Sequence, residues 1–289
     1  MRNVTEENLT DLVTDRMKAE NPRVQQIATS LVKHLHAFIR EVEPTEEEWF
    51  QGIQFLTKTG QMCDDVRQEY ILLSDTLGVS MLVDAINHRK GGTGSTESTV
   101  MGPFHADAAA RENGDMIAEG DEAERGDPMV VRGRVLSEDG TPLAGAKLDV
   151  WQAADDGFYD VQPESGQDLG NLRGVFTADE NGEFWYRAIA PLYYPVPTDG
   201  PVGQLLTATG RHPMRPAHIH FWIVAEGHEA LITHIFRDGD EYLDSDAVFG
   251  VKESLIVDFE LNESLEEAAK YGFDRPFYEV SYDFVLQKS

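Results

Sequence analysis

The sequence predicts a protein of mixed α and β structure, in which a helical N-terminal domain precedes an antiparallel β-sandwich. Up to about residue 105, apolar residues recur at the spacing of amphipathic helices. From Met129 onward they alternate with polar residues, in short segments separated by turn signals. Several short strands of this kind are typical of a sandwich or barrel. We therefore expect a helical domain over residues 1–104 and a β-sandwich domain over residues 105–289.

Four helices are expected in the first domain. Asn21 and Pro22 form a cap and a first-turn proline, and Thr45 with Glu48 forms a capping box before a second helix. VRQEYILLSDTLG and VSMLVDAINHRK supply the third and the fourth helix. The apolar positions of the first two helices are Val24, Ile27, Leu31, Leu35 and Ile39, followed by Trp49, Ile53 and Leu56.

The second domain is expected to begin with an acidic connection over residues 105–127. The part from Asp107 to Asp127 is rich in alanine and interrupted by glycine, which is typical of a surface segment. VVRGRVLSEDGTPLAGAKLDVWQ and GVFTADENGEFWYRAIAP then each indicate strand, turn and strand. The turns are expected at residues 138–140 and 180–182.

Composition excludes several classes of function. The 289 residues carry 52 acidic and 24 basic side chains, a formal net charge of −28, which opposes binding to nucleic acid or to an anionic membrane. No apolar run approaches the ~20 residues of a membrane span, and MRNVTEENLTD lacks the features of a signal peptide. Cys63 is the single cysteine, so any metal site must use nitrogen and oxygen ligands. We expect a cytoplasmic location.

The segment RPAHIHFWIVA places two histidines in an apolar strand. Because side chains alternate along a strand, His218 and His220 face the same side. They are either a hydrogen-bonded pair on a half-exposed sheet or two ligands of a metal, which then needs further ligands. Tyr159 in GFYD and Tyr194 in YYPVP lie in loops, where a tyrosine is usually a packed ring with a bonded hydroxyl. A phenolate ligand suits a hard, highly charged ion such as Fe(III).

Taken together, these motifs resemble those of the intradiol aromatic-ring-cleaving dioxygenases, a non-haem Fe(III) family that includes catechol 1,2-dioxygenases. The order and spacing of GFYD, YPVP and RPAHIH match, and the resemblance covers nearly the whole chain. It implies Fe(III) bound by Tyr159, Tyr194, His218 and His220 with a hydroxide. It also implies that Tyr194 accepts a substrate proton when it is displaced, and that Arg215 stabilises negative charge on the ring.

The resemblance also implies a substrate pocket and a choice of substrate. In LLSDTLG, Asp75 stands where catechol-cleaving relatives have proline, and its carboxylate suits a substrate with an additional hydroxyl. STVMGPFH and THIF, which contains His234, are also similar to hydroxyquinol-cleaving members, although THIF assigns no role to His234. The implied pocket residues are Leu72, Asp75, Val100, Gly102, Pro103, Phe104, Val196, Pro197, Arg215 and Val248.

We therefore expect cleavage of hydroxyquinol (benzene-1,2,4-triol) by O2 to 3-hydroxy-cis,cis-muconate and maleylacetate. The alternatives are a catechol or chlorocatechol 1,2-dioxygenase, in which Asp75 is a helix-surface or capping carboxylate. Outside the enzymes, the HxH pair also occurs in cupin-like modules that bind a metal or a sugar.

The helices before residue 90 predict self-association. Their apolar stripes exceed what one short helical layer can cover, and relatives pair through this domain, in places around a bound amphipathic lipid. We expect a homodimer through the N-terminal helices, with a phospholipid bound between them.

Overall fold

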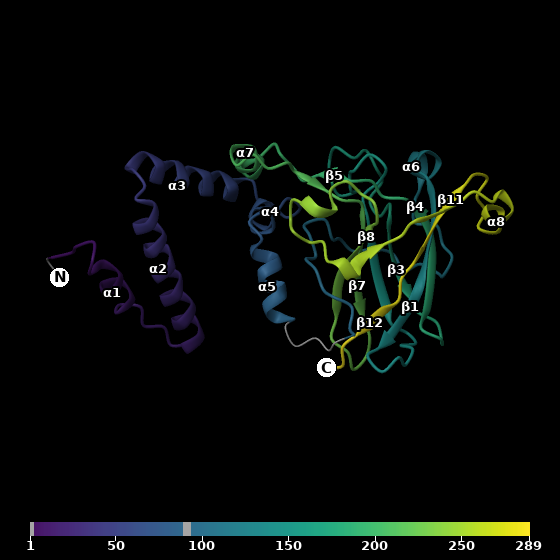
Figure 1. The fold of residues 1–289 in the computed structure, drawn as a ribbon, viewed down its shortest axis with the longest axis horizontal. Coiled ribbons are helices and arrows are strands. Elements are labelled where there is room, and N and C mark those ends of the chain that lie inside the picture. Colours follow the sequence, from purple (N-terminus) through teal and green to yellow (C-terminus); the bar gives the residue numbers. More distant parts are fainter. Residues whose placement is uncertain (1–2, 89–93) are drawn as a thin grey trace. The chain divides into compact units, whose positions relative to one another are not determined.

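The computed structural model describes residues 3–88 and 94–289. The chain divides into two compact units (Figure 1). The first ends at Thr57 and the second begins at Lys58, and we describe them separately. The expected domain boundary at residue 104 stays a prediction.

The first unit contains the helices α1 (Leu9–Thr14) and α2 (Pro22–Val42) and most of α3 (Glu46–Gln61). The predicted helix starts are confirmed. The Asn21 side chain accepts a hydrogen bond from the backbone N–H of Arg23 at 2.8 Å. In the capping box, Thr45 N–H donates to the Glu48 carboxylate at 2.8 Å, and Glu48 N–H donates to the Thr45 hydroxyl at 3.2 Å. Helix α1 was not predicted.

Helix α2 carries an apolar face that stays exposed. None of its 21 residues is buried. A helix in a globular protein normally gains its stability by burying such a face. Its exposed apolar side chains are Val24, Ile27, Leu31, Leu35, Phe38, Ile39 and Val42.

The second unit begins with the end of α3, α4 (Glu69–Thr76) and α5 (Val79–Asn87). Gly78, with φ of 71°, separates α4 from α5 in the left-handed conformation that favours glycine. The expected third helix is shorter than its sequence pattern. Residues 89–90 of the expected fourth helix lie outside the described residues.

Two five-stranded sheets form the predicted sandwich (Figure 1). The first sheet has the order β10-β11-β1-β12, and β4 also pairs with β1. The second has the order β3-β2-β7-β8-β9. The sandwich is mixed rather than wholly antiparallel, because β1 runs parallel to β11 and β12, and β8 runs parallel to β9.

The strands of the first sheet are β1 (Pro128–Ser137), β4 (Glu183–Ile189), β10 (Glu260–Asn262), β11 (Phe277–Ser281) and β12 (Phe284–Leu286). Those of the second are β2 (Lys147–Trp151), β3 (Arg173–Thr177), β7 (His218–Val224), β8 (Leu231–Arg237) and β9 (Ile256–Val257). A separate pair consists of β5 (Tyr194–Pro195) and β6 (Met214–Arg215). The remaining helices are α6 (Gly120–Arg125), α7 (Pro201–Ala208) and α8 (Leu265–Lys270), with 3-10 turns η1 (Leu243–Ser245) and η2 (Glu253–Leu255).

The core lies between the two sheets. Val131 and Phe184 come from one sheet, Leu148 and Phe221 from the other, and all four are buried in one cluster. The predicted turns form, with Gly140 at φ of 81° and Gly182 at φ of 73°. Each turn nevertheless joins strands of different sheets, because β1 pairs with β4 while β2 pairs with β3 and β7. Alternation alone does not specify which sheet a strand joins.

The expected surface connection was partly wrong. Ile117 and Ala118 are 1% and 3% exposed and belong to the core. The backbone N–H of Ile117 donates to Arg187 at 2.9 Å, and its carbonyl accepts from Leu172 at 2.8 Å. Apolar burial at this point outweighs the acidic composition of the surrounding segment.

No helix within residues 3–88 and 94–289 is long and apolar enough to cross a membrane.

Candidate active site

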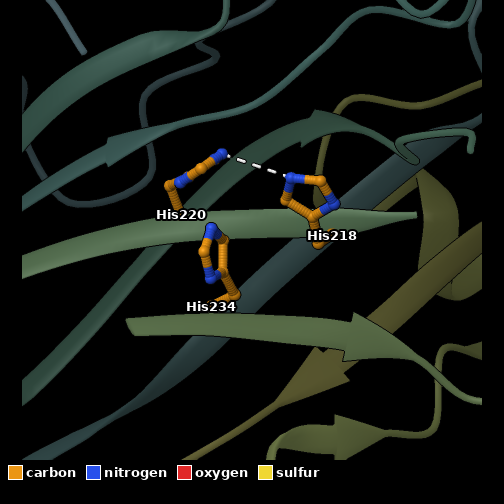
Figure 2. Close-up of side chains that lie close together, drawn as sticks. All are labelled: His218, His220 and His234. Atoms are coloured by element: carbon orange, nitrogen blue, oxygen red, sulfur yellow. Dashed lines mark hydrogen bonds between the residues drawn. The ribbon is translucent and has the colours of Figure 1, made fainter. Parts of the chain in front are cut away.

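Four side chains predicted as metal ligands converge at one end of the second sheet. The Tyr159 hydroxyl lies 3.0 Å from Nε2 of His220, 3.2 Å from the Tyr194 hydroxyl and 3.4 Å from Nε2 of His218. The two histidine Nε2 atoms are 3.2 Å apart (Figure 2). All four residues are at most 4% exposed. Tyrosines and histidines that are distant in sequence therefore form one buried cluster.

Local geometry explains why each segment reaches the cluster. His218 and His220 share a face of β7, and Tyr159 follows β2, the neighbour of β7 in the sheet. Tyr194 lies opposite Arg215 in the short β5–β6 pair. Gly157 has φ of 84°, and a Cβ at that position would lie 2.7 Å from Cβ of Tyr194. The glycine of GFYD is therefore needed for the close approach of the two tyrosine segments.

The spacing of the four donor atoms suits a metal ion. Donors at about 2.0–2.2 Å from a common centre, at angles between octahedral and tetrahedral values, are about 2.8–3.6 Å apart. Burial above all, followed by Arg215 for His218 and by His234 for His220, holds the pKa of each imidazole well below its ordinary value. Both rings are therefore neutral, which is the form that binds metals.

The phenol of Tyr159 is shifted in the opposite direction. Burial, followed by the proximity of Tyr194, raises its pKa well above the ordinary value, and Arg215 and Arg173 only partly oppose this effect. A buried phenol in this position stays protonated unless a cation is bound beside it. A metal ion reverses that balance, since it stabilises the phenolate directly. A highly charged ion would therefore be the partner that turns the Tyr159 phenol into a phenolate ligand.

Arg215 is held beside these donors by Asp246. The Arg215 Nε donates to the Asp246 carboxylate at 3.1 Å, and its Nη1 lies 3.1 Å from Nε2 of His218. Arg215 is 3% exposed, and burial by itself lowers its pKa. Asp246 and the two tyrosines outweigh burial, so the net pKa lies above the ordinary value and Arg215 is positively charged. The carboxylate of Asp246 also accepts hydrogen bonds from the backbone N–H groups of Val248 and Gly250.

Several predicted pocket residues border the same cluster. Phe104 stacks on Tyr159, with ring centroids 4.8 Å apart and an angle of 26° between the planes. A Cβ on Gly102 would lie 3.3 Å from Cε1 of His220, so a side chain there would crowd this ring. A cavity of about 190 Å³ lies beside Phe104. Four of the predicted pocket residues line it, namely Leu72, Pro103, Phe104 and Pro197.

Asp75 is buried on α4, at 3% exposed. Burial is the largest influence and raises the pKa of its carboxyl above the ordinary value. A hydrogen bond from Ser80 and the charge of Arg215 partly oppose that shift, whereas Asp246 adds to it. Asp75 is therefore neither a surface carboxylate nor a helix N-cap, which were its alternative interpretations.

The remaining three predicted pocket residues lie close to residues of the site in the chain. Val196 is buried directly after β5, and its N–H donates to Pro213 at 2.9 Å. Val248 is buried beside Asp246. Val100 lies between Thr99, which hydrogen-bonds to His234, and Met101, which packs against the cluster containing Tyr159.

Some residues around the cluster were not predicted. Trp151 stacks on His220 with centroids 4.7 Å apart, and Thr99 hydrogen-bonds to His234. His234 lies directly opposite His220 across β7 and β8. Ligand atoms of His218, His220 and His234 all lie within 4.8 Å of one another (Figure 2). THIF pointed to His234, but only the strand register reveals its place beside His220.

Two family models together match most of the chain. The family described as "Catechol dioxygenase N terminus" matches residues 21–93, and the family described as "Dioxygenase" matches residues 100–288. A hydroxyquinol 1,2-dioxygenase of Rhizobium sp. (strain MTP-10005) is 53% identical over 98% of this chain and 96% of its own length. A 6-chlorohydroxyquinol 1,2-dioxygenase of Cupriavidus pinatubonensis is 55% identical over 90% of this chain and 93% of its own.

A solved structure of a dioxygenase is also similar to this chain in fold and in sequence. The hydroxyquinol 1,2-dioxygenase of Pseudomonas putida DLL-E4 has a TM-score of 0.88 and 51% identity, covering 98% of this chain and 99% of that chain. Both parts of the sequence and the overall fold therefore lead to one assignment. The chain belongs to the intradiol ring-cleavage dioxygenase family.

Proposed function

We propose that the chain cleaves hydroxyquinol with O2, using a ferric ion held by Tyr159, Tyr194, His218 and His220. The family consists of metalloenzymes, and the observation that carries the assignment is the spacing of 3.0–3.4 Å recorded among these four donors. Two phenolates and a hydroxide balance the charge of a ferric ion, while the imidazoles add neutral nitrogen. The relatives named as hydroxyquinol 1,2-dioxygenases support the substrate.

When bound, the ferric ion supplies Lewis acidity and draws electron density from the aromatic ring, which makes the ring reactive toward O2. The chain has to accept the protons that the substrate loses. Tyr194 is suited to this role because its phenolate oxygen is a base within the cluster, 3.2 Å from the Tyr159 hydroxyl. Tyr194 would be one of the residues that hold the ion, and its phenolate would take the proton of a substrate hydroxyl.

Arg215 supplies a fixed positive charge beside the ring. Its guanidinium group is buried and oriented by Asp246 at 3.1 Å, so it needs no reorganisation when negative charge develops on the substrate. The same charge favours the deprotonated substrate over the neutral one. We assign Arg215 to the stabilisation of this anionic form.

Asp75 carries the choice of hydroxyquinol over catechol or chlorocatechol. A buried carboxylate is costly even with the hydrogen bond from Ser80, and a third substrate hydroxyl gives it a further hydrogen-bond donor. Most of the other residues assigned to substrate binding are apolar or glycine and serve as walls, namely Leu72, Val100, Gly102, Pro103, Phe104, Val196, Pro197 and Val248. Membership of the dioxygenase family leaves no support for the cupin-like binding module.

The reaction breaks the bond between the two adjacent carbons that carry hydroxyl groups. Each carbon takes one oxygen atom of O2, which gives 3-hydroxy-cis,cis-muconate and, after tautomerisation, maleylacetate. Purified protein tests the proposal through iron content, a visible charge-transfer band from iron bound to tyrosinate, and ring cleavage of hydroxyquinol and catechol. We expect a burgundy protein that prefers hydroxyquinol. A colourless, fully metallated protein would contradict the ligand set, and a preference for catechol would contradict the substrate.

We also propose that two copies pair through the N-terminal helices. The exposed apolar stripe of α2 runs through Val24, Leu31, Leu35 and Val42, along most of the helix. A second copy offers the same stripe, so that a two-fold contact covers both. A phospholipid whose chains fill the rest of this interface is the second part of the proposal, and lipid extraction with mass spectrometry tests it.

We propose a cytoplasmic location because Cys63 is free and the aromatic substrates of such enzymes are small molecules. Cell fractionation tests this, and recovery from an extracytoplasmic fraction would contradict it.

A further inference from the structure

His218 and His220 are oriented in different ways. The Nδ1 of His218 lies 2.7 Å from the Pro216 carbonyl, which fixes the ring and leaves Nε2 facing the cluster. The Nδ1 of His220 is buried and has no hydrogen-bond partner among the described residues. Metal-binding histidines usually gain their orientation from a hydrogen bond at the second ring nitrogen. His220 therefore requires another means of orientation.

Ring packing supplies contacts on both sides of His220. Trp151 stacks on it with centroids 4.7 Å apart and nearly parallel planes, at 14°. His234, its partner across β7 and β8, has its ring centroid 4.1 Å away at 60°. His234 also packs against His218, with centroids 5.0 Å apart at 89°. Figure 2 shows His234 on the adjacent strand, beside both other histidines.

The His234 ring is itself fixed by Thr99. The Thr99 hydroxyl hydrogen-bonds to Nδ1 of His234, and both residues are buried. The backbone N–H of Thr99 donates to the Ile232 carbonyl at 2.8 Å, which anchors Thr99 to β8. Whichever atom donates the side-chain hydrogen bond, it prevents the His234 ring from rotating. Nε2 of His234 has no partner among the described residues, so this bond is its only recorded polar anchor.

We propose that Thr99 and His234 form a positioning pair for the metal centre. Thr99 fixes the His234 ring, and His234 holds His220 against Trp151, in place of the hydrogen bond that orients His218. This inference rests on the proposed function, because it takes His220 as a ligand of the ferric ion. Loss of the Thr99 hydroxyl then loosens His220 and weakens iron binding without removing any ligand.

The test compares Thr99→Val with Thr233→Val. Both changes are close to isosteric and remove one buried hydroxyl. The Thr233 hydroxyl donates to the Glu97 carbonyl at 2.7 Å, so this control loses a comparable hydrogen bond one residue from His234. Iron-loaded proteins are mixed with a strong chelator, and the loss of iron and of the visible band is followed with time. Thr99→Ser retains the hydroxyl and serves as the conservative variant.

We expect T99V to lose iron about 10- to 100-fold faster than wild type, with a shifted visible band, because disrupted ligand orientation commonly weakens metal binding by that factor. T233V and T99S should behave like wild type. Equal iron loss and equal spectra in T99V and T233V would overturn the inference while leaving the proposed function intact. A wild-type protein without the tyrosinate band would instead overturn the proposed ligand set. If T99V does not fold, the rates of iron loss from T99A and T99S are compared instead. T99A lacks the hydroxyl and T99S retains it.

Discussion

The hydroxyl oxygen of Tyr159 lies 3.0 Å from Nε2 of His220, although 61 residues separate the two in the sequence. The pairing of β2 with β7 brings them together, because Trp151 near the end of β2 lies opposite His220 in the register. A rigid sheet thus carries the histidines, and the loop that follows β2 supplies a tyrosine. Because the donors come from different segments, each of them can be removed by a single substitution without changing the others.

The first prediction concerns those donors. Tyr159→Phe and His218→Ala each remove one proposed ligand, so we expect iron content or ring-cleavage activity to fall by at least about tenfold. Iron analysis and turnover of hydroxyquinol measure this. Tyr186→Phe is the matched control, since Tyr186 is also fully buried and its hydroxyl has no partner among the described residues. Full iron occupancy with unaltered turnover in Y159F or H218A would contradict the ligand assignment.

The sequence could predict the two-domain order, the helix caps at Asn21 and Thr45 and the shared face of His218 and His220, because these depend on local spacing. The family resemblance added Tyr159, Tyr194 and the pocket. Neither the sequence pattern nor the resemblance predicted that His234 lies opposite His220, or that Ile117 is part of the core. Both features depend on strand register and on contacts between distant segments, which a local pattern does not encode.

The second prediction concerns stability and pH at Asp75. Burial raises the pKa of this carboxyl above 3.8, so the ionised form is less favourable in the folded protein than in the unfolded one. The resulting cost to stability is present in full above the folded-state pKa, decreases as the pH falls and is absent below the unfolded value. Asp75→Asn should therefore be more stable than wild type at pH 7, and this advantage should shrink toward about pH 4.

Thermal unfolding at matched iron content, from pH 7 down to pH 4, measures the difference. Asp139→Asn is the control, because Asp139 is exposed and bonded to Lys288 at 2.7 Å, and this bond lowers its pKa. D139N should bring no gain at pH 7. A D75N variant that is no more stable than wild type at pH 7 would show that burial of Asp75 carries no such cost.

The third prediction concerns association through α2. Leu31 is 58% exposed in the middle of the apolar stripe, and a charge there would have to be buried in the proposed dimer. Leu31→Glu should raise the dimer dissociation constant by at least about tenfold, or about 1.4 kcal/mol. Light scattering over a range of micromolar concentrations measures this against a chain mass of 32.3 kDa.

Gln26→Glu is the matched control for association. Gln26 is exposed on α2 and lies on the side of the helix away from the stripe, so the same charge is added outside the proposed interface. Q26E should remain dimeric. A wild-type protein with a monomeric mass would refute pairing, and equal dissociation constants for L31E and Q26E would place any dimer contact elsewhere.

The last prediction tests the choice of substrate through Asp75. If the carboxylate accepts a hydrogen bond from the third hydroxyl, Asp75→Ala removes an interaction that hydroxyquinol makes and catechol cannot make. A hydrogen bond to a charged group contributes about 1.5–3 kcal/mol, so kcat/KM for hydroxyquinol should fall by about ten- to more than a hundredfold. Catechol turnover should fall much less, or rise, because the pocket loses a buried charge to which catechol donates no hydrogen bond. The ratio of the two specificity constants is the quantity to measure, on iron-replete protein, because a defect in folding or metal content lowers both constants and cancels. An unchanged ratio would show that Asp75 does not recognise the third hydroxyl, and it would remove the main residue-level reason for preferring hydroxyquinol while leaving the family assignment intact.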